Sequence, residues 1–305
     1  MRALYILQLL FELEARKQGG NECMLVFDDI ADSFDYRNKY AIVEYLHDLD
    51  AKCGGLFKLL ILTHNFDFYR TIFNRLNLRS DQICMAIRQT DGSIEIKNGT
   101  YVKDVYAKVI IPRSNVREMF LTWIPFARNL IEYHKGTDNE DYSTLTSCLH
   151  QKSDTVAITD TKVKQILDQY SQGHNCLWLC TGRSIESLIY EAADDLLTRH
   201  DLDPICIENK VVLSMAIRHL AEKYMKRQLL ATGMTDADLA TNDTQTGAWT
   251  QLMKDRCPSD PKMDVIEKVN MMTPELIHIN SFMYEPLIDM SIEHLTDLYQ
   301  ECKSL

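Results

Sequence analysis

Two short apolar runs, each ending in polar residues, constrain the fold of this chain more than any other feature. Residues 23–27 form the first run, and Asp28 and Asp29 follow it. Residues 58–63 form the second run, and His64 follows it. Each run has the length of a strand, and neither alternates between apolar and polar residues. Such runs are typical of strands buried on both faces of a parallel sheet, so we expect an α/β fold here.

Helical and strand patterns alternate from the start of the chain to about residue 111. This order predicts an α/β lobe of parallel strands plus a hairpin over residues 1–111. A turn with Asp91 and Gly92 separates the two strands of the predicted hairpin. The expected elements, in order, are helix 3–17, strand 23–27, helix 40–49, strand 58–63, helix 66–78, hairpin strands 82–88 and 93–97, and strand 105–111.

Strand patterns become rare after Pro112, and residues 112–305 are predicted to form a mainly α-helical region. Two polar stretches, 135–160 and 230–245, are predicted to be loops. Residues 273–286 are expected to have a structural role. The predicted helices of this region are 115–134, 161–171, 184–199, 208–229, 246–255 and 287–303.

Composition narrows the class of protein. The 305 residues include 33 Lys and Arg against 44 Asp and Glu, a net charge of −11. This balance excludes a protein whose whole surface binds nucleic acid, although a local basic groove for DNA or RNA is compatible with it. The nine cysteines are scattered, and the first apolar stretch is too short and polar for a membrane span or leader. We therefore expect a cytoplasmic protein with reduced thiols and no membrane partner.

The polar residues that follow the two runs suggest a site that binds a metal ion and a nucleotide. Carboxyl ends of parallel strands meet at one edge of a sheet, and ligands bind there. Asp28 would hold Mg²⁺ through its water shell, and Asp29 would orient or deprotonate an attacking water. His64, delivered to the same edge, would contact a terminal phosphate. The pattern predicts a Mg²⁺-nucleotide site.

These residues together resemble the C-terminal half of an ABC-type ATPase head. The nearest branch is that of the RecF/SMC-like and PrrC/RloC-like ATPases, P-loop NTPases also grouped as an AAA family. The resemblance covers about residues 1–110. It implies that Asp28 is the Walker B ligand of Mg²⁺ and that Asp29 takes the place of the catalytic glutamate. It also implies that Ser33 and Asp35 belong to the D-loop that reaches across a head dimer, and that His64 is the switch histidine.

The chain departs from that family in three ways. It contains no G-x-x-x-x-G-K-[ST] phosphate-binding loop and no LSGGE-like signature. Asp29 is one methylene shorter than glutamate, which changes its reach toward water. The resemblance therefore implies ATP binding and hydrolysis only after completion by a missing N-terminal half, with a second head as dimer partner.

A second motif suggests a different activity. Arg128 and His134 form an R-N-x-x-x-x-H string on the predicted helix 115–134. It is similar to the active-site motif of HEPN-type ribonucleases, in which the histidine acts as acid or base and the arginine stabilises phosphate charge. Such strings arise readily in a chain with nine histidines, so we favour a solvated helix face over a nuclease site.

Three functions remain open from the sequence. The first is an ATPase component with a nucleic-acid-linked role, such as DNA repair or antiviral defence. The second is a non-catalytic scaffold that binds a partner through the face left exposed by the missing lobe. The third is an ATP-gated ribonuclease that uses Arg128 and His134.

Overall fold

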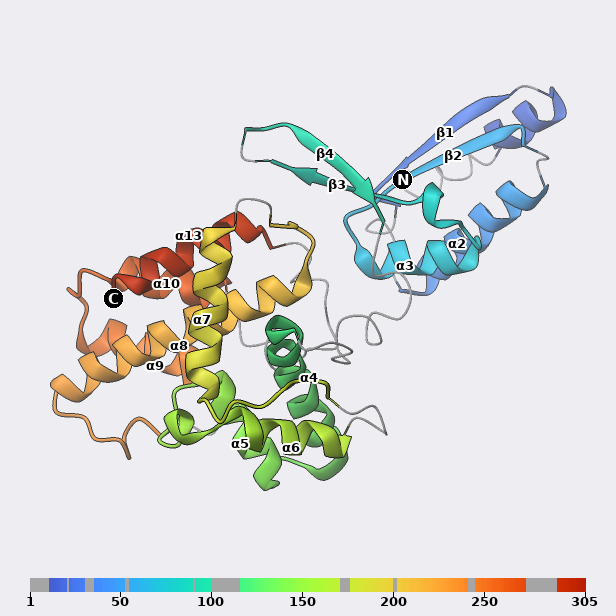
Figure 1. Ribbon diagram of the computed structural model, residues 1–305. Helices are drawn as coiled ribbons and strands as arrows, with labels where there is room; N and C mark the ends of the chain where they lie inside the picture. Colours follow the sequence, from blue (N-terminus) through green and yellow to red (C-terminus); the bar gives the residue numbers. More distant parts are fainter. Residues whose placement is uncertain are drawn as a thin grey trace. The chain divides into compact units, whose positions relative to one another are not determined.

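The computed structural model divides the chain into two compact units, Met1–Asp104 and Val105–Leu305, described separately below (Figure 1). The boundary expected after residue 111 and the strand expected at 105–111 lie outside the described residues, as do Ser33, Asp35 and residues 273–286. The structure describes residues 11–20, 22–30, 36–52, 55–89, 91–99, 116–170, 176–199, 202–240, 245–272 and 290–305.

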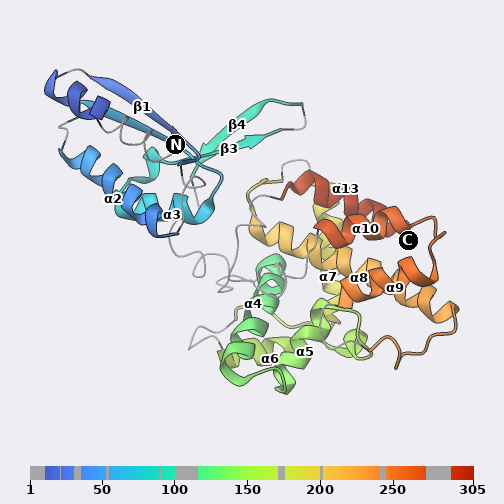
Figure 2. The same cartoon turned by 180° about the vertical axis from the view of Figure 1, so that it is seen from behind.

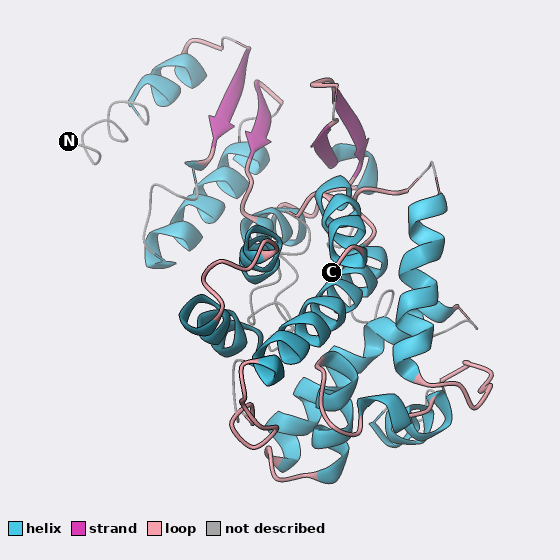
Figure 3. Cartoon of the chain, turned by 90° about the vertical axis from the view of Figure 1, so that its left-hand side faces the viewer, coloured by secondary structure: helices cyan, strands magenta, loops and turns pink. Residues whose placement is uncertain are grey.

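The first unit contains the predicted parallel pair of strands. β1 (Cys23–Asp28) and β2 (Phe57–Leu62) are connected through α2 (Tyr36–Lys52), and Figure 3 shows both arrows pointing the same way. The register places Cys23 opposite Phe57 and Asp28 opposite Leu62. The two strands therefore end at the same edge, and residues 29 and 64 follow from that edge.

One face of this sheet carries the core of the unit. The helix over residues 11–18, α2 and α3 (Phe66–Arg75) supply its helical side chains. Aliphatic and aromatic groups from alternate strand positions pack against them because successive strand residues point to opposite faces. The buried members are Leu13, Phe27, Val43, Leu46, Leu49, Phe57, Phe68 and Ile72.

The other face of the sheet is open, which corrects the expectation of strands buried on both faces. Met24 and Val26 on β1 are 63% and 56% exposed, and Leu60 and Leu62 on β2 are 40% and 45% exposed. A continuous apolar run thus provides apolar side chains for two faces, but the described residues cover only one of them.

The predicted hairpin is confirmed. β3 (Cys84–Arg88) pairs antiparallel with β4 (Ile94–Asn98), after the short 3₁₀ helix η2 (Ser80–Gln82). The turn between the strands requires Gly92, whose φ of +85° lies in the left-handed region that favours glycine.

The second unit is a bundle of helices around α8 (Figure 2). α8 is 25 residues long and is buried on most sides, because α4, α7, α9 and α13 all pack against it. The described helices are α4 (Arg117–Lys135), α5 (Glu140–Leu149), α6 (Asp160–Tyr170), α7 (Ile185–Thr198), α8 (Ile207–Ala231), α9 (Gln245–Arg256), α10 (Met263–Met272) and α13 (Ile292–Lys303), with a 3₁₀ turn η4 (Thr155–Ala157). The first unit combines strands with helices, and the second unit is helical, which agrees with the expected fold class at this coarse level.

The prediction of a loop over residues 135–160 is wrong, because α5 lies within it. Asn139 caps this helix by accepting hydrogen bonds from the backbone N–H of Asp141 and Tyr142. Leu145 and Leu149 are buried against the rest of the bundle. Tertiary packing thus stabilises a short segment whose Ser and Thr content disfavours an isolated helix.

None of the helices that the structure describes has the length and apolar character needed to cross a membrane.

Candidate functional site

The strand ends of the first unit place two acids and a histidine together. Asp28 is the last residue of β1 and is exposed. The backbone N–H of Asp29 donates to the carbonyl of Leu62 at 3.0 Å, which continues the strand pairing by one step. Asp29 has a φ of 44°, a left-handed conformation that is uncommon for residues other than glycine and ends the extended strand.

Asp29 and His64 contact each other directly. The Oδ1 atom of Asp29 accepts from the backbone N–H of His64 at 3.1 Å and lies 2.9 Å from its Nδ1 atom. A carboxylate accepts hydrogen bonds, so Nδ1 carries the proton in this contact. Both side chains remain accessible to solvent. The contact joins residues 35 positions apart in the sequence.

A capped turn holds His64 between β2 and α3. The side chain of Asn65 accepts from the backbone N–H of Phe68 at 2.8 Å and caps α3. The backbone N–H of Asn65 donates to the hydroxyl of Thr63 at 3.1 Å. These bonds explain why the Thr63-His64-Asn65 segment presents the imidazole toward the end of β1.

The described residues at this edge could supply one or two carboxylates to a metal ion but not a full set of protein ligands. No group of three or more His, Cys, Asp and Glu side chains in the described part of the chain is placed to hold a metal ion. Magnesium bound to a nucleotide needs only one or two carboxylates, because phosphates and water supply the remaining ligands. The exposed carboxylate of Asp28 at the sheet edge fits that requirement.

The two ribonuclease candidates, Arg128 and His134, lie in different environments. Arg128 is buried, which corrects the expected solvated face: Nε donates to the hydroxyl of Thr146 at 2.9 Å, and the guanidinium lies over the ring of Tyr142 at 4.5 Å. His134 is exposed near the end of α4 and lines a shallow pocket beside Tyr170. Among the described contacts none joins the two residues, and Arg128 serves to pack α4 against α5.

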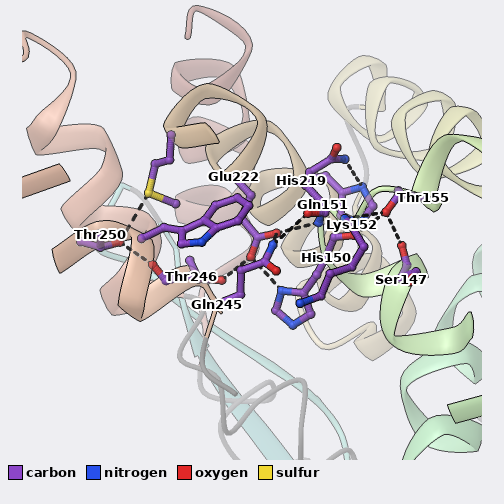
Figure 4. A network of polar contacts seen from close by, with 12 residues as sticks. Ser147, His150, Gln151, Lys152, Thr155, His219, Glu222, Gln245, Thr246 and Thr250 are labelled. Atoms are coloured by element: carbon purple, nitrogen blue, oxygen red, sulfur yellow. Dashed lines mark hydrogen bonds and ion pairs between the residues drawn. The ribbon is translucent and has the colours of Figure 1, made fainter. Parts of the chain in front are cut away.

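The helical unit contains a buried polar network that the sequence analysis above did not predict (Figure 4). At its centre is Glu222 of α8, which is fully buried. Its carboxylate accepts from the backbone N–H of Gln151 at 2.7 Å, from Gln245 at 2.8 Å and from Thr246 at 2.7 Å. Nδ1 of His150 lies 2.7 Å from it. Burial alone would raise the pKa of Glu222, but the charge and hydrogen bond of His150, with further contributions from other groups, lower it to about 2.

His219 extends this network. Its Nε2 atom lies 2.9 Å from the carbonyl of Cys148 and must donate there, so Nδ1 accepts from the side-chain amide of Gln151 at 3.1 Å. The other amide hydrogen of Gln151 goes to Glu186 at 2.7 Å. Burial disfavours the imidazolium form and lowers the pKa of His219 to about 4.

The network has the properties of a structural element. The polar groups named above bond to one another inside the bundle, and they come from four distant parts of the sequence near residues 150, 186, 220 and 245. The available sequence signal is the presence of charged residues on several sides of α8, which indicates that polar groups are buried within this helix.

A comparison of the chain with protein-family models, curated proteins and solved structures finds no match. The geometry of the strand ends therefore carries the functional proposal.

Proposed function

We propose that this chain is the C-terminal portion of an ABC-type ATPase that binds and hydrolyses Mg²⁺-ATP once a half with the phosphate-binding loop and signature completes it. The observation that supports this most is the contact between Asp29 and His64 beside Asp28. The two partners follow different strands, β1 and β2, and meet at the carboxyl edge, where parallel sheets bind ligands. The resemblance of the strand-end motifs adds a nucleic-acid-linked role to the proposal, in DNA repair or antiviral defence.

Each residue has a distinct task in this proposal. Asp28 holds Mg²⁺, which neutralises charge on the triphosphate when bound. Asp29 orients the attacking water and accepts its proton. Two N–H groups of His64, the backbone N–H and Nδ1–H, donate to Oδ1 of Asp29. In this proposal the second oxygen, Oδ2, accepts the hydrogen bond from the water. Ser33 and Asp35 contact the nucleotide or the second head of a dimer.

The test is ATP hydrolysis by the chain co-expressed with the coding region immediately upstream. We expect magnesium-dependent hydrolysis by the completed assembly and none by this chain alone. Asp29→Asn should lower the rate at least about 100-fold, because the side chain loses its basic oxygen. Asp67→Asn is the matched control, since Asp67 is an exposed acid in the first turn of α3. Equal rates for Asp29→Asn and wild type would contradict the proposal.

The open face of the sheet supports a second candidate function, a partner-binding scaffold without catalysis. Four aliphatic side chains on that face are exposed, as a docking surface requires. This function predicts that the completed assembly forms but neither binds Mg²⁺-ATP nor hydrolyses it. Calorimetric titration of the assembly with ATP, with and without Mg²⁺, separates the two candidates.

A further inference from the structure

The β3–β4 hairpin is a sheet of two strands (Figure 1). Among the described residues, no strand pairs with the outer edge of β4. The bonds at the two ends of the hairpin run from the N–H of Gln89 to the carbonyl of Ser93 and from the N–H of Gly99 to the carbonyl of Ile83. Hydrogen-bonded pairs alternate with non-bonded pairs along an antiparallel ladder, so the odd-numbered residues of β4 bond to β3.

The outer edge of β4 therefore carries the backbone groups of the even-numbered residues. The N–H and C=O groups of Ile94, Ile96 and Asn98 point away from β3. Ile94 and Ile96 are also 68% and 62% exposed, so apolar side chains accompany these backbone groups. An edge of this kind is a template for pairing with a further strand.

The charges of β4 select a second copy of the same strand as the occupant. Glu95 and Lys97 lie on either side of Ile96, and their charged atoms are 3.8 Å apart. An antiparallel pair of two β4 strands centred on Ile96 places Glu95 of each copy directly opposite Lys97 of the other copy. The four charges then alternate in sign around the centre of the pair. Opposite charges at facing positions stabilise a pair of strands, and like charges destabilise it.

The backbone geometry allows the same register. A residue that lies opposite its own copy exchanges two hydrogen bonds only if its N–H and C=O point toward the partner strand. Ile96 meets this condition, and Ile94 and Asn98 meet it when each lies opposite the other across the two copies. Backbone groups and charges therefore match in one register.

The other charged side chains of the hairpin do not disturb this match. Arg88 belongs to β3 and shares the face of Ile94, its partner in the ladder, whereas Glu95 lies on the opposite face. Asp91 lies in the turn and accepts from the backbone N–H of Ser93 at 2.8 Å.

The edge of β3 offers no comparable match. A pair of β3 strands centred on Ala86 would place Cys84 opposite Arg88 and would contain no pair of opposite charges. The self-complementary pattern is thus a property of β4.

We propose that two copies of this chain form a symmetric dimer by antiparallel pairing of their β4 strands, centred on Ile96. A strand of five residues is much smaller than the about 20–30 residues per side of a standard interface, so the dimer is weak, with a dissociation constant of about 10–100 μM. The inference goes beyond the ATPase proposal, because this pairing needs no nucleotide. It is also distinct from the head dimer of that proposal, which would use Ser33 and Asp35.

The experiment measures the mass of the full chain by sedimentation equilibrium, at concentrations about tenfold below and above the expected dissociation constant. The buffer contains EDTA and no nucleotide, so the result is independent of ATP hydrolysis. A reducing agent prevents disulfide formation through the exposed Cys84. We expect a reversible equilibrium between monomer and dimer.

Two charge variants test the register. Glu95→Lys and Lys97→Glu each place like charges at facing positions and should weaken the dimer at least about tenfold. In an equimolar mixture the strand of one variant carries two positive charges and that of the other carries two negative charges, so the mixture should dimerise as tightly as wild type. Glu12→Lys makes the same change of charge at an exposed position of the helix over residues 11–18 and should leave the dimer unchanged.

Hydrogen exchange of the wild-type chain locates the interface without any substitution. The amides of Ile94 and Ile96 acquire bonding partners in the dimer, whereas those of Glu95 and Lys97 already bond to β3. As the concentration rises, the first two amides should gain more protection than the second two, measured by NMR. Circular dichroism checks that the charge variants are folded.

Three results would overturn the inference. The first is a wild-type chain that remains monomeric at every concentration. The second is a dimer that both Glu95→Lys and Lys97→Glu leave unchanged, which would place the interface elsewhere. The third is a mixture of these two variants that dimerises no better than either one alone.

Discussion

The two units of this chain place the titratable residues of their main polar clusters in opposite environments. In the helical unit, Glu222 and His219 are fully buried and bonded within one network. In the α/β unit, Asp28, Asp29 and His64 lie at a solvent-accessible sheet edge beside an open apolar face. Buried, satisfied charges specify a fold, whereas accessible charges at a strand end remain available to a ligand. The difference gives the helical unit a buried structural network and leaves the polar groups at the strand ends of the α/β unit accessible.

The largest expected effect lies in the buried network. Glu222→Gln replaces one accepting oxygen with an amide that faces donors, so we expect a loss of about 3–5 kcal/mol in the free energy of unfolding. The measurement is urea denaturation followed by tryptophan fluorescence. Trp123, Trp178 and Trp249 are the only tryptophans of the chain, and all belong to the second unit.

The control for Glu222 is an ion pair on the surface of the same unit. Glu301 pairs with Lys268 at 2.8 Å, and both side chains are exposed. Glu301→Gln should cost less than about 1 kcal/mol. If both variants lost the same stability, the contrast between buried and accessible charges would be wrong.

The next expected effect is a dependence of the stability of the helical unit on pH. The pKa of His219 falls from its ordinary 6.5 to about 4 in the folded chain. Between these values the unfolded chain binds the proton more readily, so stability is full above pH 6.5 and falls as the pH decreases toward 4. Thermal unfolding followed by tryptophan fluorescence should show this decrease in the helical unit.

Two variants examine the origin of that pH dependence. His219→Gln should reduce the slope between pH 6.5 and 4, whereas His134→Gln, at an exposed position on α4, should preserve it. An unchanged slope in His219→Gln would attribute the acid sensitivity to other groups, among them His150, whose pKa burial also lowers.

The smallest effects come from one substitution made in both units. Val212 of α8 is fully buried, and Val26 of β1 is exposed. Val212→Thr buries a hydroxyl and should cost about 2 kcal/mol, whereas Val26→Thr keeps a β-branched residue in water and should change stability by less than about 0.5 kcal/mol. Hydrogen exchange of the amides in each unit measures both. A cost at Val26 equal to that at Val212 would mean that the open face is covered in the chain by itself.

Part of this structure follows from local sequence. The apolar runs and the polar residues after them predict β1, β2 and the shared edge that brings Asp29 and His64 together, because parallel strands end on the same side. The sequence did not predict which of the two acids contacts the histidine, since that depends on the left-handed turn at Asp29. It also did not predict the open face, because an apolar run is the same whether a second layer covers it or not.

The helical unit shows where local patterns fail. α5 was missed because its Ser and Thr residues disfavour a helix until Leu145 and Leu149 pack. The contacts of Glu222 were missed because Gln151 and Gln245 reach it from distant segments with no common spacing. Arg128 resembled part of a nuclease motif, although its burial against α5 gives it a packing role. The D-loop assignment of Ser33 and Asp35 stays a prediction.

The central claim is that Asp29 and His64 act as one unit in ATP hydrolysis. A double-mutant cycle with Asp29→Asn and His64→Ala, measured as the magnesium-dependent ATPase rate of the completed assembly, tests it most directly. Each single variant should lower the rate about 100-fold, and the double variant should be no slower than the single variants. Rate losses that simply multiply, or single variants as active as wild type, would contradict the claim.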